Sequence, residues 1–387
     1  MSKIKKETLV IVESPAKCKK IESYLGAGFK CMATYGHLRH LQNLNDIRIS
    51  KENIEIHFHE SIDKKKVIAS LKKYAKSSGR VILATDNDRE GEAIAWHVCD
   101  ICKLCISTTE RMVFTEITEK AIKQSFQNLG TLNMDLVQAQ HARQVLDILI
   151  GFKISPLLWN HLHSVSKKDS QGLSAGRCQT PALRLLYENM NQIEESKKNM
   201  KFEYDTNGFF GKHNIKCNLD YTLQTQEIEP FLEASKSHEH KCHKSDAKKT
   251  THQSPTPLTT SKLQQLAHSQ LKLTSKTTMR YAQTLYEKGL ITYMRTDSEQ
   301  YSDVFVGQAK EYIEETYGAE YFEENHKTQS KKKRKNEKVK AQEAHEAIRP
   351  TDLRFDVSES NLTKPEMRLY DFIHAHTLET CMASAKG

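Results

Sequence analysis

Short apolar runs near the start of the chain alternate with stretches of helical periodicity. Residues 9–12 and 81–84 are continuously apolar, and a polar turn and a helical pattern follow each run. Runs of this length, bounded by turn residues, are typical of buried strands in a parallel sheet. A third run at 111–114 precedes a helix that we expect from Thr118. This repeat of strand and helix predicts a mostly parallel, layered sheet up to about residue 134.

The pattern changes after this sheet. Residues 135–165 and 260–289 show helical spacing, and a last helix is expected from Lys364. Residues 201–232 alternate as β-structure does, and residues 236–253 are polar without periodicity, as in a linker. The predicted fold class is therefore multidomain, with an N-terminal α/β part followed by largely α-helical parts and one β-rich segment.

Composition and charge narrow the class of partner. The chain has 387 residues, enough for two or three domains, and a net charge of +9. Such an excess favours a polyanionic partner, nucleic acid first. Part of this positive charge comes from the basic run 331–335. That run is a passive solvated insertion, or it adds non-specific affinity for phosphates, or it resembles a nuclear localisation signal.

The sequence also indicates a compartment. It has nine scattered cysteines, and we find neither a signal peptide nor an apolar run long enough to span a bilayer. These features predict a reducing, cytoplasmic and DNA-associated location, with a host nucleus or a virus factory as alternatives.

Acidic residues cluster where the second apolar run ends. Asp86, Asp88, Glu90 and Glu92 lie between the expected strand and the following helix. Crowded carboxylates repel one another unless a cation lies among them, and hard oxygen ligands suit Mg²⁺. Acids in a first helical turn can instead offset the helix dipole, which accounts for Glu90 and Glu92 better than for the two aspartates. Glu13 follows the first run in the same way, and joins the cluster if the two strands are neighbours.

Other polar groups have two interpretations each. Lys17 opposes the dipole in the first turn of its helix, so it either contacts a phosphate or is simply solvated. The turn at 172–181 offers a phosphate site beside Arg177, or merely connects helices. A soft metal could bind at Cys99, Cys102 and Cys105, which could instead be ordinary helical thiols. It could also bind at His238, His240, Cys242 and His243, which could instead belong to a polar connector.

Seven segments together resemble the type IA DNA topoisomerases, the bacterial topoisomerase I branch in particular. They occur in the family's order at residues 10–17, 36–37, 85–97, 114–117, 172–181, 289–298 and 341–350. Met294 follows the bacterial form, whereas Gln179-Thr180-Pro181 is closer to the topoisomerase III form.

The resemblance implies a toroidal fold with a TOPRIM domain at residues 7–134. Residues 135–195 would begin the single-strand-binding domain, and 196–253 would form the first part of the β-rich gate with its linker. Residues 254–378 would be the catalytic tyrosine domain, and 379–387 would start the return to the gate. Because family members continue further, we expect a partial toroid, either a fragment or a chain that a second chain completes.

The resemblance also implies a mechanism. Tyr293 would attack a DNA phosphodiester and hold the 5′-phosphate, freeing a 3′-hydroxyl without ATP. Arg295 and Lys17 would stabilise the phosphate charge. Glu13 would handle the proton of the leaving oxygen, with Mg²⁺ as cofactor.

By the same resemblance, the magnesium ligands would be Glu13, Asp86, Asp88 and Glu90. The DNA-binding positions would be His37, Arg143, Gln144, Asp147, Phe152, Trp159, Ser174, Ala175, Gly176, Arg177, Cys178, Gln179, Arg295 and His345. Three of these depart from the family's usual residues. Phe152 replaces an aromatic that is often Tyr, Gln144 replaces a second Arg, and Cys178 replaces Val.

The first functional hypothesis is therefore an enzyme that relaxes negatively supercoiled DNA by single-strand cleavage, passage and religation. The alternative is a truncated, non-catalytic single-stranded-DNA-binding fragment of the same family. Another TOPRIM enzyme, such as a primase or nuclease, uses the acids but leaves residues 292–298 and 341–350 without a role. Without the resemblance, Tyr293 reads equally well as a half-buried aromatic.

Overall fold

A computed structural model describes residues 7–51, 53–161, 173–198, 207–210, 215–218, 224–239, 241, 243, 246–322 and 346–386. The chain forms two compact units. The first comprises Met1–Leu149 and Lys249–Gly387, and the second comprises Ile150–Lys248. In the described residues no helix is both long and apolar enough to cross a membrane.

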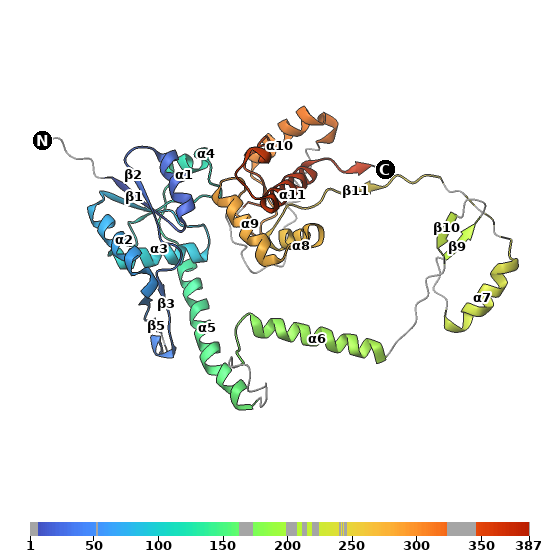
Figure 1. Ribbon diagram of the computed structural model, residues 1–387, viewed down its shortest axis with the longest axis horizontal. Helices are drawn as coiled ribbons and strands as arrows, with labels where there is room; N and C mark the ends of the chain where they lie inside the picture. The colour runs from blue at the N-terminus through green and yellow to red at the C-terminus, as the bar shows by residue number, and fades with distance from the viewer. Residues whose placement is uncertain are drawn as a thin grey trace. The chain divides into compact units, whose positions relative to one another are not determined.

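A four-stranded parallel sheet forms the centre of the first unit's N-terminal part (Figure 1). Its order is β2 (Phe29–Ala33), β1 (Thr8–Val12), β7 (Arg80–Leu83) and β8 (Glu110–Arg111). The central strand pairs on both sides, with Val10 opposite Cys31 and Ile82. Because β1 is covered on both faces, its apolar run is continuous rather than alternating.

Two pairs of helices cover this sheet. Val10 and Val12 pack in a core with α1 (Pro15–Leu25) and α4 (Glu119–Gln127). Leu9 and Ile11 face the other way, toward α2 (Lys65–Ser77) and α3 (Arg89–Cys102). The predicted layered, parallel sheet is thus confirmed, although its third apolar run forms only the two-residue strand β8.

Short elements complete this part. The paired strands are β3 (Arg39–His40) with β6 (His59–Glu60), and β4 (Ile47–Ile49) with β5 (Ile54–Ile56). The described residues also contain the single-turn helices η1 (Leu44–Asp46) and η2 (Ile62–Lys64) in this part, and η3 (Ala319–Tyr321) and η5 (Val357–Glu359) in the C-terminal part.

The C-terminal part of the first unit is helical, as predicted. It contains α8 (Thr260–Leu271), α9 (Ser275–Glu287), α10 (Asp303–Thr316) and α11 (Lys364–Cys381), with β11 (Thr251–His252) paired to β12 (Ala385–Lys386). One hydrophobic core joins this part to the sheet, because Leu285, Ile291 and Tyr293 belong to the same cluster as Val10 and Ile82. The shared core fixes the helical part against the sheet.

The second unit has little core of its own. Helix α5 (Met134–His161) runs on from the first unit, and α6 (Gln179–Lys198) follows. The hairpin of β9 (Asn207–Phe210) and β10 (Ile215–Asn218) confirms part of the predicted β-structure. Residues 201–206, 211–214 and 219–223 of that prediction lie outside the described residues. At residues 225–232 the prediction is wrong, since α7 (Thr225–Ser237) is a helix with a capping box between Gln224 and Glu227.

Candidate active site

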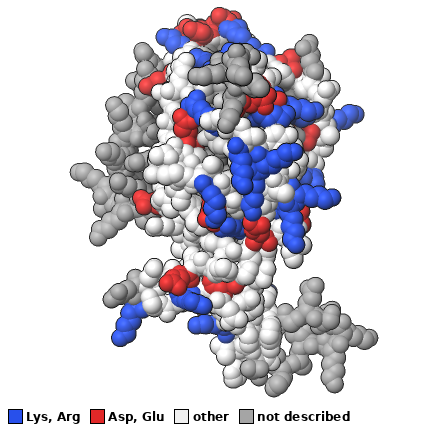
Figure 2. Space-filling model, turned by 90° about the vertical axis from the view of Figure 1, so that its left-hand side faces the viewer, with Lys and Arg blue, Asp and Glu red and all other residues white. Residues whose placement is uncertain are grey.

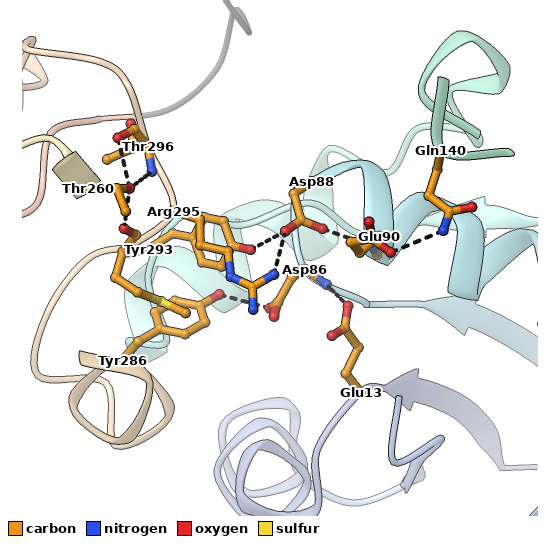
Figure 3. A network of polar contacts seen from close by, with 12 residues as sticks. Glu13, Asp86, Asp88, Glu90, Gln140, Thr260, Tyr286, Tyr293, Arg295 and Thr296 are labelled. Carbon is orange, nitrogen blue, oxygen red and sulfur yellow. Dashed lines mark hydrogen bonds and ion pairs between the residues drawn. The ribbon is translucent and has the colours of Figure 1, made fainter. Parts of the chain in front are cut away.

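The acids that follow β1 and β7 meet at the carboxyl edge of the sheet. These strands are direct neighbours, so Glu13 and Asp86 lie side by side. The Asp86 backbone N–H donates to Glu13 Oε1 at 3.0 Å, as Figure 3 shows. This edge is where open α/β sheets place their ligands.

The first turn of α3, directly after the turn from β7, permits only glycine at position 91. Asp88 caps α3, since its Oδ1 accepts the Gly91 N–H at 2.8 Å. A Cβ on Gly91 would lie 2.1 Å from the Asp86 carbonyl oxygen. The Thr85 hydroxyl closes the turn by donating to the Gly91 carbonyl at 2.8 Å. Close packing at Gly91 therefore holds both aspartates at the edge.

A buried ion pair supports the same turn from within. Arg111 is 1% exposed, and its Nε lies 2.8 Å from Glu92 Oε1. Its Nη2 donates to the Asp86 carbonyl at 2.9 Å. Glu92 therefore belongs to the fold rather than to the acid cluster. Sequence reasoning missed Arg111, for which the available signal was an arginine at the start of an apolar strand.

Tyr293 reaches the acid edge from the helical part. Its hydroxyl donates to Asp88 Oδ2 at 2.5 Å, and its backbone N–H donates to the Thr115 carbonyl at 2.8 Å. Its ring packs edge-on against Tyr286 with centroids 5.2 Å apart. Burial and the charges of Asp86 and Asp88 raise the pKa of the Tyr293 phenol far above its usual value, so it stays protonated.

Two cations accompany the tyrosine. Arg295 Nη1 lies 3.6 Å from Asp88 Oδ2, and the Lys17 ammonium pairs with Asp86. Lys17 also lies over the Tyr286 ring, 5.1 Å from its centroid. Because Lys17 is 1% exposed, the interpretation as a simply solvated side chain is wrong.

A cavity of about 340 Å³ opens between the acids and the helical part. Its lining residues are Glu13, Asp86, Met279, Arg280, Gln283, Met294 and Arg295. Carboxylates and guanidinium groups thus line one space, a set suited to acid–base chemistry on an anionic substrate. The Tyr293 phenol is not among the lining residues, but it contacts Asp88 of the same acid edge.

Comparison with known proteins identifies the family. A family model described as DNA topoisomerase matches residues 131–387, and one described as Toprim domain matches residues 8–117. This chain is a member of the type IA DNA topoisomerases.

A solved structure is similar over nearly the whole chain. It is full-length topoisomerase I from Thermotoga maritima in a monoclinic crystal form, with a TM-score of 0.81 and 32% sequence identity. The match covers 98% of this chain and 61% of the Thermotoga chain. The present topoisomerase chain therefore spans less than two thirds of the length of that protein.

The donor chemistry of the topoisomerase edge fits a hard cation. Burial raises the Glu13 pKa to about 7, and the negative charge of Asp86 is the second cause. The positive charge of Lys17 acts in the opposite direction. A cation would relieve this repulsion between carboxylates. In the described part of the chain, however, no three His, Cys, Asp or Glu side chains converge closely enough to hold a metal ion. Asp86 instead pairs with Lys17, and Asp88 accepts the Tyr293 hydroxyl.

Glu90 faces a different set of partners. His37 Nε2 lies 2.8 Å and Gln140 Nε2 3.1 Å from its Oε2, and Arg143 Nη1 lies 4.0 Å from its Oε1. The hydrogen bond from His37 lowers the Glu90 pKa to about 2. Burial opposes this effect, and the charge of His37 adds to it. Two predicted DNA-binding residues, His37 and Arg143, therefore gather on one predicted metal ligand.

Apart from Arg295 and His345, the remaining predicted DNA-binding positions lie on α5 or in the turn at 172–181 that leads into α6. Gln144 and Asp147 lie on α5 within the first unit. In the second unit, Phe152 and Trp159 are 47% and 54% exposed, and the Trp159 indole N–H donates to the Leu173 carbonyl.

The small-residue turn of the second unit is held by local hydrogen bonds. The Ala175 N–H donates to Ser155 Oγ at 3.0 Å, and Gln179 Nε2 donates to the Ser174 carbonyl at 2.9 Å. The remaining predicted residues of this turn are Gly176, Arg177 and Cys178. His345 and the basic run 331–335 lie outside the described residues, as do His240 and Cys242 of the soft-metal alternative.

Proposed function

We propose that this topoisomerase chain cleaves and rejoins single DNA strands through Tyr293, and thereby relaxes negatively supercoiled DNA. The phenolic oxygen attacks a backbone phosphodiester, forms a phosphotyrosine bond to the 5′-phosphate and releases the 3′-hydroxyl. Reversal of the same step rejoins the strand, so the bond energy is kept and ATP is not required. The observation that carries this proposal is the hydrogen bond between Tyr293 and Asp88, which are 205 positions apart in the sequence.

Proton transfer follows from the two carboxylates nearest the reaction. The Tyr293 proton passes to Asp88, which already accepts its hydrogen bond. Glu13 lies beside Asp86 at the same edge and handles the proton of the leaving 3′-oxygen. Arg295 and Lys17 stabilise the negative charge that develops on the phosphate.

Magnesium belongs to this proposal as a charge-neutralising cofactor. Glu13, Asp86 and Asp88 would hold it, with Glu90 completing the acidic set. When bound, Mg²⁺ supplies positive charge next to the phosphate oxygens. This requires Asp88 and Asp86 to exchange some of their contacts with Tyr293 and Lys17.

The proposed substrate is a single DNA strand. His37 and Arg143 would contact its phosphates beside Glu90, and Phe152 and Trp159 would stack on its bases. The basic side chains spread over the face shown in Figure 2 and the net charge of +9 support a polyanionic substrate.

An adduct assay tests the proposal. The chain is mixed with a labelled single-stranded oligonucleotide and Mg²⁺, denatured and separated by gel electrophoresis. We expect a covalent protein–DNA adduct from the wild type and none from Tyr293→Phe. Tyr301→Phe is the matched control, because Tyr301 is a partly buried tyrosine whose hydroxyl is also hydrogen-bonded, here to Thr380. Absence of an adduct from the wild type contradicts the proposal.

A second candidate function is single-strand binding without cleavage. It is favoured by the second unit, where α6 has no buried residue. It predicts salt-sensitive oligonucleotide binding that is indifferent to Mg²⁺ and to Tyr293→Phe.

A further inference from the structure

Tyr35 has an unusual backbone conformation for its residue type. It follows β2, and its φ is +58°, in the left-handed region, with Gly36 next to it at +92°. Two consecutive positive φ values are characteristic of turns that favour Asn, Asp and Gly. A bulky side chain in this region is a true outlier, and such strain is concentrated at functional sites.

Hydrogen bonds on both sides hold this conformation. The Tyr35 N–H donates to the Glu13 carbonyl at 2.8 Å. Its own carbonyl accepts from Lys64 Nζ at 2.9 Å. The backbone of Tyr35 is therefore fixed directly beside a residue of the acid edge.

The side chain of Tyr35 contributes little to the fold. It is 55% exposed, and the Lys64 ammonium lies 5.7 Å from the ring centroid. A small polar residue would suit this turn better and would expose less apolar surface. The ring is thus presented to solvent in a fixed position, at a cost in backbone strain.

The sheet order places this ring along the path of a strand bound at the active site. Tyr35 follows β2, Glu13 follows β1 and Asp86 follows β7, three adjacent strands. Neighbouring strands lie about 4.8 Å apart, so the ends of β2 and β7, which lead to Tyr35 and Asp86, are about 10 Å apart. This corresponds to about three stacked nucleotides at 3.4 Å each.

We propose that the Tyr35 ring stacks on a base of the bound DNA strand, about three nucleotides from the cleaved phosphate. The inference rests on the proposed function, because it assumes a strand at the acid edge. Stacking needs only a flat π-face, which every base offers, so Tyr35 would position the strand with little sequence preference. The Lys64 ammonium beside the ring adds a positive charge next to the strand.

Oligonucleotide binding tests the inference, measured in EDTA so that no cleavage intervenes. We expect Tyr35→Asn to weaken binding of a single-stranded oligonucleotide about 5- to 100-fold. Tyr35→Phe should bind as the wild type does, because it keeps the ring. Tyr74→Asn is the matched control, since Tyr74 is a 40% exposed tyrosine on α2.

An abasic scan identifies the base. Removing one base at a time should weaken wild-type binding at the stacked position, whereas Tyr35→Asn should lose nothing further there. Tyr35→Asn should weaken DNA binding but stabilise the fold. Because asparagine tolerates this backbone region, thermal unfolding should show a Tm about 1–3 °C higher than that of the wild type.

Two results would overturn the inference. One is unchanged binding by Tyr35→Asn, and the other is an equal loss in Tyr35→Phe, which would assign the effect to the hydroxyl. The adduct assay tests the proposed function independently of this inference. It depends on Tyr293 and Mg²⁺, whereas this binding measurement depends on neither.

Discussion

The acid edge of the first unit and helix α6 of the second unit use charge in opposite ways. At the edge, Lys17 and Arg111 are each 1% exposed and pair with Asp86 and Glu92. On α6, no residue is buried, and the Arg184–Glu188 pair is a local contact between exposed side chains. Buried partners come from distant parts of the chain and fix the geometry, whereas the exposed pair only supports its own helix.

Apolar side chains follow the same division. The strand β1 buries its apolar residues completely, while α6 leaves Leu183, Leu186 and Met190 at least 60% exposed. The first unit therefore has an arranged reaction centre with its own core. The second unit presents a surface whose apolar residues have no cover within the described residues.

The sharpest test of this difference removes one arginine from each region. Arg111→Ala leaves the Glu92 carboxylate buried without its partner, which should cost about 3–5 kcal/mol of unfolding free energy. Arg184→Ala, the matched control, should cost at most about 0.5 kcal/mol. Urea unfolding followed by circular dichroism measures both.

The double variant Arg111→Ala with Glu92→Ala separates the ion pair from the loss of packing. It should recover part of the stability, because no unpaired charge remains. Equal urea midpoints for Arg111→Ala and Arg184→Ala would show that the buried pair does not hold the edge.

The contrast between local and distant contacts also explains what could be predicted from sequence. The sequence predicts that Glu13 joins Asp86 if their strands are neighbours, because each residue follows an apolar run and parallel strands end at one edge. The pairing of β1 with β7 meets that condition. The convergence of Tyr293 on this edge has no local signal. It followed only from the family resemblance, since its contact with Asp88 spans 205 positions.

Two errors have the same origin. Arg111 acts through a partner 19 residues away, so its role is visible only once the strand and helix are packed. The β-structure expected at residues 225–232 is wrong because short-range alternation outweighed the helix-start signal at Gln224 and Glu227.

Glycines in the two regions should respond oppositely to the same substitution. Gly91→Ala forces a Cβ to within 2.1 Å of the Asp86 carbonyl oxygen, so it should destabilise by about 1–3 kcal/mol and displace the aspartates. Gly151→Ala on α5 meets nothing within 4 Å and should stabilise by up to about 1 kcal/mol through helix propensity.

Urea unfolding and the adduct assay together check these substitutions. Gly91→Ala should lose adduct as well as stability, while Gly151→Ala should keep the adduct. A Gly91→Ala protein of wild-type stability would mean that the turn between β7 and α3 is not closely packed.

The smallest effect concerns the electrostatic strain at Glu13. Its pKa is raised from 4.5 to about 7 in the folded chain by burial and by Asp86. The folded state therefore binds this proton more tightly than the unfolded state does. The stabilisation is fully present below pH 4.5 and is lost as pH rises through 7.

A rise in pKa from 4.5 to about 7 corresponds to at most about 3 kcal/mol. Partial solvent screening of this carboxyl reduces the expected fall in unfolding free energy to about 1–2 kcal/mol when no divalent cation is present. Glu13→Gln cannot titrate and should remove this component, whereas Glu188→Gln on α6 should leave the wild-type profile unchanged. Urea unfolding at several pH values between 4.5 and 7.5 measures it. Adding Mg²⁺ should flatten the wild-type profile, because a cation at the edge favours the charged carboxylate. Parallel profiles for the wild type and Glu13→Gln would mean that the carboxylates do not repel one another, and would remove the reason to place a cation among them.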